Sequence, residues 1–321
     1  MDFPRPEILK TGEVRIATYQ CGDRAAPPLI LLHGWPEMAY SWAPLMQPLA
    51  RAGYRVIAMD IRGFGHSDAP YEVEAYRIDH LVGDVEAVMN MLDIREAVLV
   101  GHDWGGIIVW HAARMIEERV RGVISICTPH MKRPPADPID IFRARHGDEH
   151  YFVKFTDNPT IETLFDRDPM AVFKLLFRKT PKGAKISSDM YALPKMLQAY
   201  LDAGTPDLPG AVMLEQDLQV YAGAYTHSGF RGGINLYRNT SANYRLTRDL
   251  PDEISQPSLM LSAADDLFLP PEMADPMEEM VVDLERHTVE NCGHWAMWEQ
   301  PETICKIMTE WLLRKMGLRF Y

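Results

Sequence analysis

Short apolar runs, each followed by a polar or glycine-rich loop, recur along the chain. Five such runs occupy residues 28–32, 55–60, 97–100, 122–127 and 258–262. Residues 14–20 instead alternate between apolar and polar, which is typical of an antiparallel strand. Between these runs lie stretches such as 79–91, in which apolar residues recur about every 3.6 residues, as in a helix. The alternation predicts an α/β fold with a mostly parallel sheet covered by helices on both faces.

This alternation stops in the middle of the chain. From 132 to 248 the pattern is helical, most clearly at 162–178, 190–201 and 214–225, and strand-like runs resume near 256–258. A helical insert within an α/β sheet is typical of a lid over the carboxyl ends of the strands, where functional loops are positioned. We therefore expect a core formed by 1–131 and 249–321 and an all-helical cap formed by 132–248.

The run at 97–100 leads into the segment GHDWG at 101–105 and then into an apolar helix. Strand, glycine turn and helix are the context of a nucleophile elbow, whose usual pattern G-x-S-x-G places serine at the apex. Here the apex residue is Asp103. Aspartate is also common in ordinary turns, but the flanking strand and helix favour catalysis. A carboxylate with an ordinary pKa of about 3.9 is ionised at neutral pH without an activating base. It suits attack on an sp³ carbon that bears a leaving group, which yields an ester.

The groups needed to hydrolyse such an ester follow in the order typical of this motif, nucleophile, acid, histidine. Asp265 and Asp266 come just after the run at 258–262, and His294 lies near the C-terminal end. We expect His294 to activate water, oriented by one carboxylate of the 265–266 pair. Each motif alone is compatible with an ordinary turn, whereas all three on the expected loops favour a catalytic triad.

Hydrolysis of the ester passes through a tetrahedral anion, which two backbone N–H groups should stabilise. Trp104 directly follows the nucleophile, and Trp35 follows the run at 28–32 in the sequence HGWP. We expect these two residues to form the oxyanion hole. HGWP is also a tight turn by composition, and both interpretations are compatible.

Composition narrows the classes of partner. The 321 residues carry a formal net charge of −12, which disfavours nucleic acid as a partner. Four scattered cysteines without C-x-x-C spacing argue against zinc and against a disulfide framework. No apolar run approaches the length of a membrane span, and the first residues resemble no signal peptide, so we expect a cytoplasmic protein. We expect no metal and no organic cofactor.

Taken together, the motifs resemble those of the α/β-hydrolase fold and specifically of the soluble epoxide hydrolases. The resemblance rests on HGWPEMAYSW at 33–42, DIRGFGHSDAP at 60–70, GHDWGG at 101–106 and NCGHW at 291–295. It implies an eight-stranded, mostly parallel sheet with an inserted helical lid. It also places the triad acid at Asp266 rather than Asp265 and a cis peptide bond before Pro36.

The same resemblance implies two lid tyrosines. The segment HYFVKF at 150–155, with its register fixed by FKLLFR at 173–178, places the first at Tyr151. The segment NLYRN at 235–239 places the second at Tyr237. Opening an epoxide leaves an alkoxide, and a phenol with a pKa of about 10 can donate the proton that this oxygen needs. The implied reaction converts a small apolar epoxide and water into a vicinal diol.

Other functions remain open at this point. A haloalkane dehalogenase uses the same Asp-His-Asp triad, and Trp104 could bind the halide that it releases. Against this function, Trp35 stands where that family commonly has asparagine, and Tyr237 would have no role in the reaction. A fluoroacetate dehalogenase is disfavoured because Trp104 replaces an arginine, and an esterase is disfavoured by Asp103. A non-catalytic relative usually lacks part of the triad. A homodimer is an open alternative to a monomer.

Overall fold

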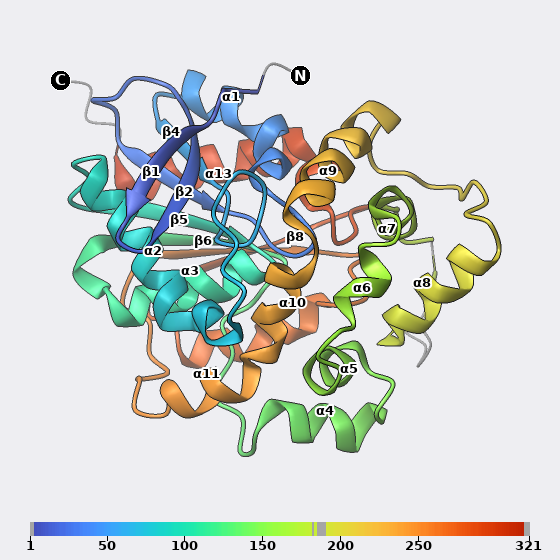
Figure 1. Ribbon diagram of the computed structural model, residues 1–321. Helices are drawn as coiled ribbons and strands as arrows, with labels where there is room; N and C mark the ends of the chain where they lie inside the picture. Colours follow the sequence, from blue (N-terminus) through green and yellow to red (C-terminus); the bar gives the residue numbers. More distant parts are fainter. Residues whose placement is uncertain (1–2, 182, 185–190, 318–321) are drawn as a thin grey trace.

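The computed structural model describes residues 3–181, 183–184 and 191–317. It contains an eight-stranded sheet with the order β1-β2-β4-β3-β5-β6-β7-β8. The strands are β1 (Glu7–Thr11), β2 (Val14–Cys21), β3 (Pro28–Leu32), β4 (Arg55–Met59), β5 (Ala97–His102), β6 (Val120–Ile126), β7 (Ser258–Ala263) and β8 (Leu284–Val289). The β1–β2 and β2–β4 pairs are antiparallel, and the other pairs are parallel. The expected α/β-hydrolase fold is therefore confirmed (Figure 1).

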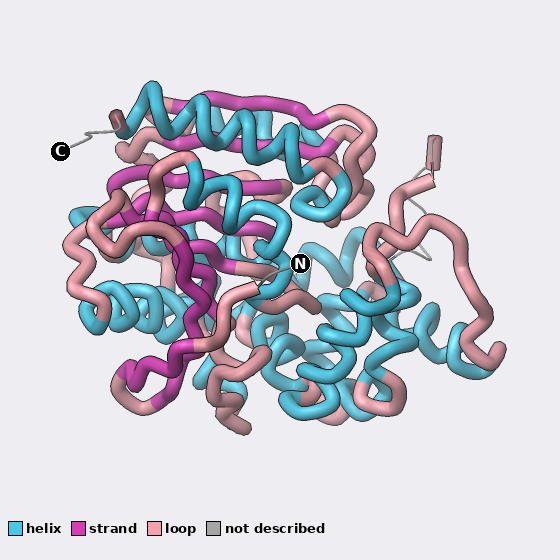
Figure 2. The backbone as a smooth tube through the Cα atoms, turned by 90° about the horizontal axis from the view of Figure 1, so that it is seen from above, coloured by secondary structure: helices cyan, strands magenta, loops and turns pink. Residues whose placement is uncertain are grey.

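Helices cover both faces of this sheet, which explains why its central strands are apolar throughout. Along β3, Ile30 and Leu32 belong to one buried cluster, which includes residues of α2 (Ile78–Met91) and α3 (Trp104–Met115). Leu29 and Leu31 belong to a second buried cluster, which includes residues of α1 (Ala43–Arg51) and α13 (Pro301–Met316). Figure 2 shows the stacked strands with helices on either side.

The chain between β6 and β7 is helical. Its helices are α4 (Pro138–His146), α5 (Tyr151–Asp157), α6 (Glu162–Phe165), α7 (Pro169–Leu176), α8 (Leu193–Asp202), α9 (Glu215–Ser228), α10 (Arg231–Arg238) and α11 (Thr240–Leu246). The β-type pairing described within 132–248 is a single bridge between Arg178 and Ala211. The division into a core and a separate cap stays a prediction. No helix in the described part of the chain is both long enough and apolar enough to cross a membrane.

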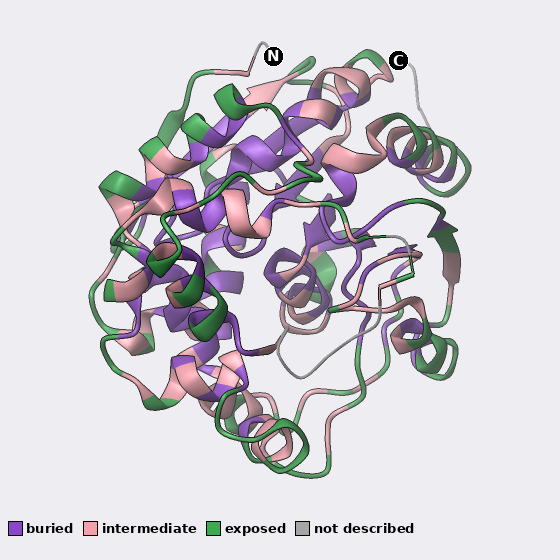
Figure 3. Ribbon diagram, turned by 90° about the vertical axis from the view of Figure 1, so that its right-hand side faces the viewer, coloured by how far each residue is buried: buried purple, intermediate pink, exposed green. Residues whose placement is uncertain are grey.

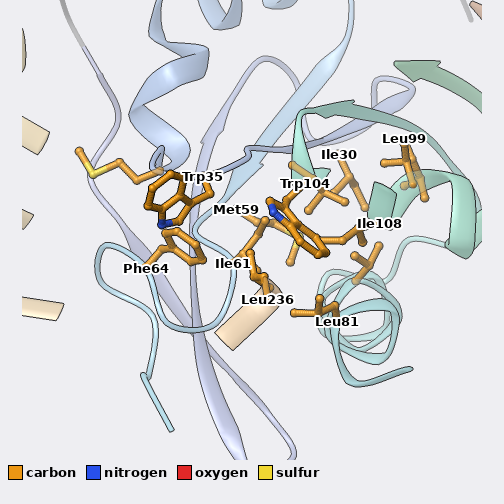
Figure 4. Packing of buried hydrophobic residues seen from close by; sticks show 14 of the residues in the cluster. Ile30, Trp35, Met59, Ile61, Phe64, Leu81, Leu99, Trp104, Ile108 and Leu236 are labelled. Atoms are coloured by element: carbon orange, nitrogen blue, oxygen red, sulfur yellow. The ribbon is translucent and has the colours of Figure 1, made fainter. Parts of the chain in front are cut away.

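Short elements complete the fold. The 3-10 helices η1 (Ala39–Trp42), η2 (Val73–Tyr76), η3 (Glu117–Arg119) and η5 (Pro271–Glu279) lie in loops, and α12 (Ala296–Glu299) precedes α13. Buried residues concentrate on the sheet and on the inward sides of the helices (Figure 3). In Figure 4, Trp35 lies beside Phe64 and Trp104 lies beside Ile108 within the buried cluster that reaches the ends of the strands.

Two details differ from the sequence-based expectations. The single helix expected at 162–178 is wrong, because α6 ends at Phe165 and α7 begins at Pro169. The Asp168 carboxylate accepts the Ala171 N–H at 3.0 Å, so it caps a new helix with proline in its first turn. The helix expected at 190–201 corresponds to α8, and Met190 lies outside the described residues.

Candidate active site

Asp103 occupies a tight turn between β5 and α3. Its backbone has φ 51° and ψ −119°, a conformation that residues other than glycine rarely adopt. The turn is possible because glycines flank it: a Cβ on Gly105 would lie 1.9 Å from the Leu32 carbonyl oxygen. This close approach packs the start of α3 against β3 and presents the Asp103 side chain at the carboxyl end of the sheet.

Backbone N–H groups hold the Asp103 carboxylate. Trp35 donates its N–H to Asp103 Oδ1 at 2.7 Å, and the Trp104 N–H also binds the carboxylate. Gly34 must be glycine here, because an added Cβ would lie 2.3 Å from the same oxygen. The two residues expected to form an oxyanion hole therefore both lie at Asp103. The Trp35–Pro36 peptide bond is cis, as the resemblance implied.

His294 connects Asp103 with the Asp266 carboxylate. Its Nδ1 donates to Asp266 Oδ2 at 2.7 Å, and its Nε2 lies 3.7 Å from Asp103 Oδ2. The other Asp266 oxygen accepts the N–H groups of Phe268 and Leu269 at 2.9 and 3.0 Å. These bonds fix the carboxylate, which in turn orients the imidazole so that Nε2 faces the nucleophile. Of the two adjacent aspartates, Asp266 is the one that bonds to His294.

Asp103, His294 and Asp266 form a row of charged groups that shift one another's pKa values. Burial raises the pKa of Asp103, while His294 and the two backbone N–H groups oppose the rise. For His294, burial favours the neutral ring, but Asp266, Asp103 and Glu37 together outweigh it and raise the pKa to about 9. A pKa of about 9 keeps a proton on His294 at neutral pH. Although burial raises the pKa of Asp266, the charge and hydrogen bond of His294 bring it below the ordinary value.

The two tyrosines expected from the resemblance lie next to each other above this row. Tyr151 is the first residue of α5 and Tyr237 lies near the end of α10, with ring centroids 5.6 Å apart. The Tyr237 ring meets Trp35 and Trp104 edge-on, at 5.5 and 5.0 Å. Burial and then the charge of Asp103 raise the pKa of both phenols, so both keep their protons at neutral pH.

A second carboxylate–histidine pair lies behind His294, and sequence reasoning missed it. Glu37 Oε2 accepts His102 Nδ1 at 2.7 Å and the Gly34 N–H at 2.7 Å. His102 Nε2 donates to the carbonyl oxygen of His294 at 2.8 Å. All these groups are buried. Both residues lie next to recognised motifs, His102 directly before Asp103 and Glu37 directly after HGWP. No local sequence pattern indicates that the two residues form a pair.

One cluster in the described residues has the composition of a metal site. Ligand atoms of His102, Cys127 and His294 lie within 4.8 Å of one another. Both ring nitrogens of His102 and Nδ1 of His294 already take part in hydrogen bonds, to Glu37, to a carbonyl and to Asp266. A metal here would have to break the contacts that orient His294, so the expectation that no metal is needed stays a prediction.

Comparisons with known proteins identify the family of this chain. Residues 27–301 match a family model described as the alpha/beta hydrolase fold. The chain is 33% identical to epoxide hydrolase A of Mycobacterium tuberculosis, over 97% of this chain and 98% of that protein. It is 35% identical to bifunctional epoxide hydrolase 2 of Sus scrofa over 95% of its own length, and it spans about half (54%) of that longer relative.

Solved structures give the same result. The crystal structure of epoxide hydrolase A from Mycobacterium thermoresistibile has a TM-score of 0.86 and 28% identity, covering 96% of this chain and 98% of that one. Epoxide hydrolase VrEH1 from Vigna radiata has a TM-score of 0.84 and 27% identity, covering 97% and 98%. With the fold, the family model and a full-length relative in agreement, this chain belongs to the α/β-hydrolase family, among its epoxide hydrolases.

Proposed function

We propose that the protein hydrolyses epoxides to vicinal diols through a covalent ester on Asp103. The observation that carries this proposal is an aspartate at the elbow with two protonated tyrosines beside it. Serine at that position would favour acyl transfer, and an aspartate without proton donors would leave an epoxide oxygen unassisted. The names of the relatives, all epoxide hydrolases, support the same reaction.

In the first step, an ionised Asp103 oxygen attacks one epoxide carbon. The C–O bond to the ring oxygen breaks, and that oxygen receives a proton from Tyr151 or Tyr237. A phenol whose pKa is raised by burial is a weak acid, so it transfers its proton only once alkoxide charge develops. The product is a hydroxyalkyl ester of Asp103, and the tyrosinate left behind recovers its proton from the His294 imidazolium, which becomes the neutral base.

In the second step, His294 removes a proton from water, which attacks the carbonyl carbon of the ester. The anion that forms lies where Trp35 and Trp104 direct their N–H groups. Esterification removes the negative charge of Asp103, which is one cause of the high His294 pKa. The pKa of His294 therefore falls after the first step, when the neutral base is required. Collapse of the anion breaks the ester C–O bond, the leaving oxygen of the diol takes the proton of the new carboxyl group, and Asp103 is again a carboxylate beside protonated His294.

A base-deficient variant tests this sequence of steps. In His294→Gln, Asp103 and both tyrosines remain, so an epoxide should alkylate the enzyme and the ester should persist. Intact-protein mass spectrometry should show one adduct of the substrate's mass, and peptide mapping should place it on Asp103. Asp103→Asn is the matched control and should form no adduct. A single wild-type turnover in ¹⁸O-water that labels the diol and leaves Asp103 unlabelled would overturn the covalent route.

Haloalkane dehalogenation is the second candidate, because the row Asp103, His294 and Asp266 serves that reaction equally well. Trp104 could donate its indole N–H to a halide, which needs no proton. The two tyrosines then have no function, which is why we place this reaction second. Turnover of styrene oxide beside 1-bromobutane separates the two: hydrolysis of the bromide alone would favour the dehalogenase.

The finer properties of the protein are also proposals. The aromatic side chains around Tyr237 favour an apolar epoxide over a charged one. Light scattering after size-exclusion chromatography tests the homodimer that the sequence left open, and fractionation of the source cells tests the cytoplasmic location.

A further inference from the structure

A buried carboxylate, Glu162 of α6, lies between two arginines of the helix that carries Tyr237. Arg231 at the start of α10 and Arg238 at its end both donate to it, Arg238 at 2.7 Å. The Glu162 side chain is only 8% exposed, and that of Arg238 only 6%. Burying such a pair rarely adds much stability compared with apolar residues, so its function is better sought in the geometry that it imposes.

Arg238 also binds the helix that begins at Tyr151. Its Nε donates to the carbonyl oxygen of Phe155 at 3.1 Å, inside α5. Its Nη2, which also binds Glu162, donates to the carbonyl of Asn158, the C-cap of α5, at 2.9 Å. A planar guanidinium with these partners joins α5, α6 and α10 in one fixed arrangement. Because Tyr237 directly precedes Arg238, this arrangement includes both tyrosines.

Arg231 extends the connection to the core. Its guanidinium carbon lies 3.8 Å from the centre of the Tyr71 ring, and its Nε donates to the Tyr71 carbonyl oxygen at 3.0 Å. Tyr71 lies in the loop between β4 and α2. The network therefore runs from a core loop through Glu162 to the end of α5.

We propose that Arg238 and Glu162 are positioning residues that set the spacing of Tyr151 and Tyr237 over the nucleophile. Neither residue touches the reacting atoms. The inference rests on the proposed function, because it assigns the network to the proton-donating step. It predicts that the network matters for ring opening and much less for hydrolysis of the ester, in which neither tyrosine donates a proton to the ring oxygen.

Single-turnover kinetics with the full chain separate the two steps. Arg238→Met removes the donors and keeps an unbranched stem, and it should slow formation of the Asp103 ester by about tenfold or more, within the range of a misplaced general acid. Hydrolysis of the ester should change by less than about threefold. Arg238→Lys should recover part of the rate because it restores the charge but not the planar fork. Glu162→Gln removes the charge but keeps the shape of the side chain, and it should also slow formation of the Asp103 ester.

A double-mutant cycle shows whether the network acts through the tyrosines. In a Tyr151→Phe background, Arg238→Met should change alkylation by less than about threefold, because the pair it positions is already incomplete. Arg143→Met is the matched control: Arg143 binds Asp157 at the end of α5 from the surface, and its removal should leave both steps unchanged. If Arg238→Met does not fold, Glu162→Gln takes its place in the cycle.

Two outcomes would overturn the inference. One is equal slowing of both steps in the folded variants, and the other is an undiminished effect in the Tyr151→Phe background. Either result in an enzyme that still alkylates Asp103 leaves the proposed function intact. A wild-type chain that never forms the adduct would instead overturn the proposed function and this inference together.

Discussion

At the scale of single residues, the charge of Asp103 contributes to the proton affinity of His294. The carboxylate is one of the groups that raise the His294 pKa to about 9. In Asp103→Asn this charge is absent, so the imidazolium loses a stabilising partner and its pKa should fall below that value. Esterification of Asp103 should lower the His294 pKa in the same way, so the neutral imidazole becomes available at lower pH.

An NMR titration of the histidine ring measures this change. The spectrum of His294→Gln identifies the resonance, and Asp265→Asn serves as the matched carboxylate control, since Asp266 is the neighbour that bonds to the ring. A His294 pKa that is unchanged or higher in Asp103→Asn would contradict the electrostatic coupling of the two groups.

The tyrosine hydroxyls give a second prediction at this scale. Tyr151→Phe and Tyr237→Phe should each slow ring opening by roughly 10- to 10⁴-fold, the usual range for loss of a general acid. Both variants should stay folded, because only one hydroxyl is lost, which circular dichroism can check. Tyr200→Phe is the control, since that hydroxyl donates to the carbonyl of Pro206 in the loop after α8.

Full epoxide turnover in Tyr237→Phe, together with loss of haloalkane turnover in Trp104→Phe, would favour the dehalogenase. The comparison uses two variants and two substrates, with each rate taken relative to the wild type, so it does not depend on absolute rates.

At the scale of elements, two helical glycines should respond in opposite directions to alanine. Gly105 lies at the start of α3, where a Cβ would lie 1.9 Å from the Leu32 carbonyl oxygen, so Gly105→Ala should destabilise the fold by about 1–3 kcal/mol or more. Gly83 lies in α2 with no heavy atom within 4 Å of an added Cβ. Gly83→Ala should therefore stabilise by about 0.5–1 kcal/mol, because alanine loses less backbone entropy.

Urea denaturation of the two variants and the wild type measures both effects. A Gly105→Ala variant as stable as the wild type would show that β3 and α3 can separate without loss, and that the elbow does not depend on their close packing.

At the scale of the whole molecule, the proposed mechanism uses protein groups alone. Chelators such as EDTA should therefore leave epoxide turnover intact, with a known zinc hydrolase as the positive control for the chelation step. Loss of activity that a divalent metal restores would contradict the mechanism and would direct attention to His102, Cys127 and His294, whose ligand atoms lie close together.

Part of this molecule follows from local sequence patterns. The apolar runs predicted the central strands because strands covered on both faces must be apolar throughout, and the sheet confirms them. The sequence patterns did not predict the edge strands β1 and β8. In β8 only Val289 is buried, so the strand has no continuous apolar run. The helix expected at 162–178 was wrong because periodicity alone does not show where Asp168 and Pro169 start a new helix.

The chemistry divides in the same way. The motifs in the sequence determined the residue types expected after the strands, Asp103, one of Asp265 and Asp266, and His294, because a motif specifies both the nucleophile and the loops on which its partners lie. The family resemblance then singled out Asp266. Only the tertiary structure decided what surrounds them. Glu37 and His102 are 65 positions apart, and Arg238 and Glu162 are 76 apart. Such pairs leave no periodic trace, because folding brings them together and long-range contacts depend on the whole chain rather than on neighbouring residues.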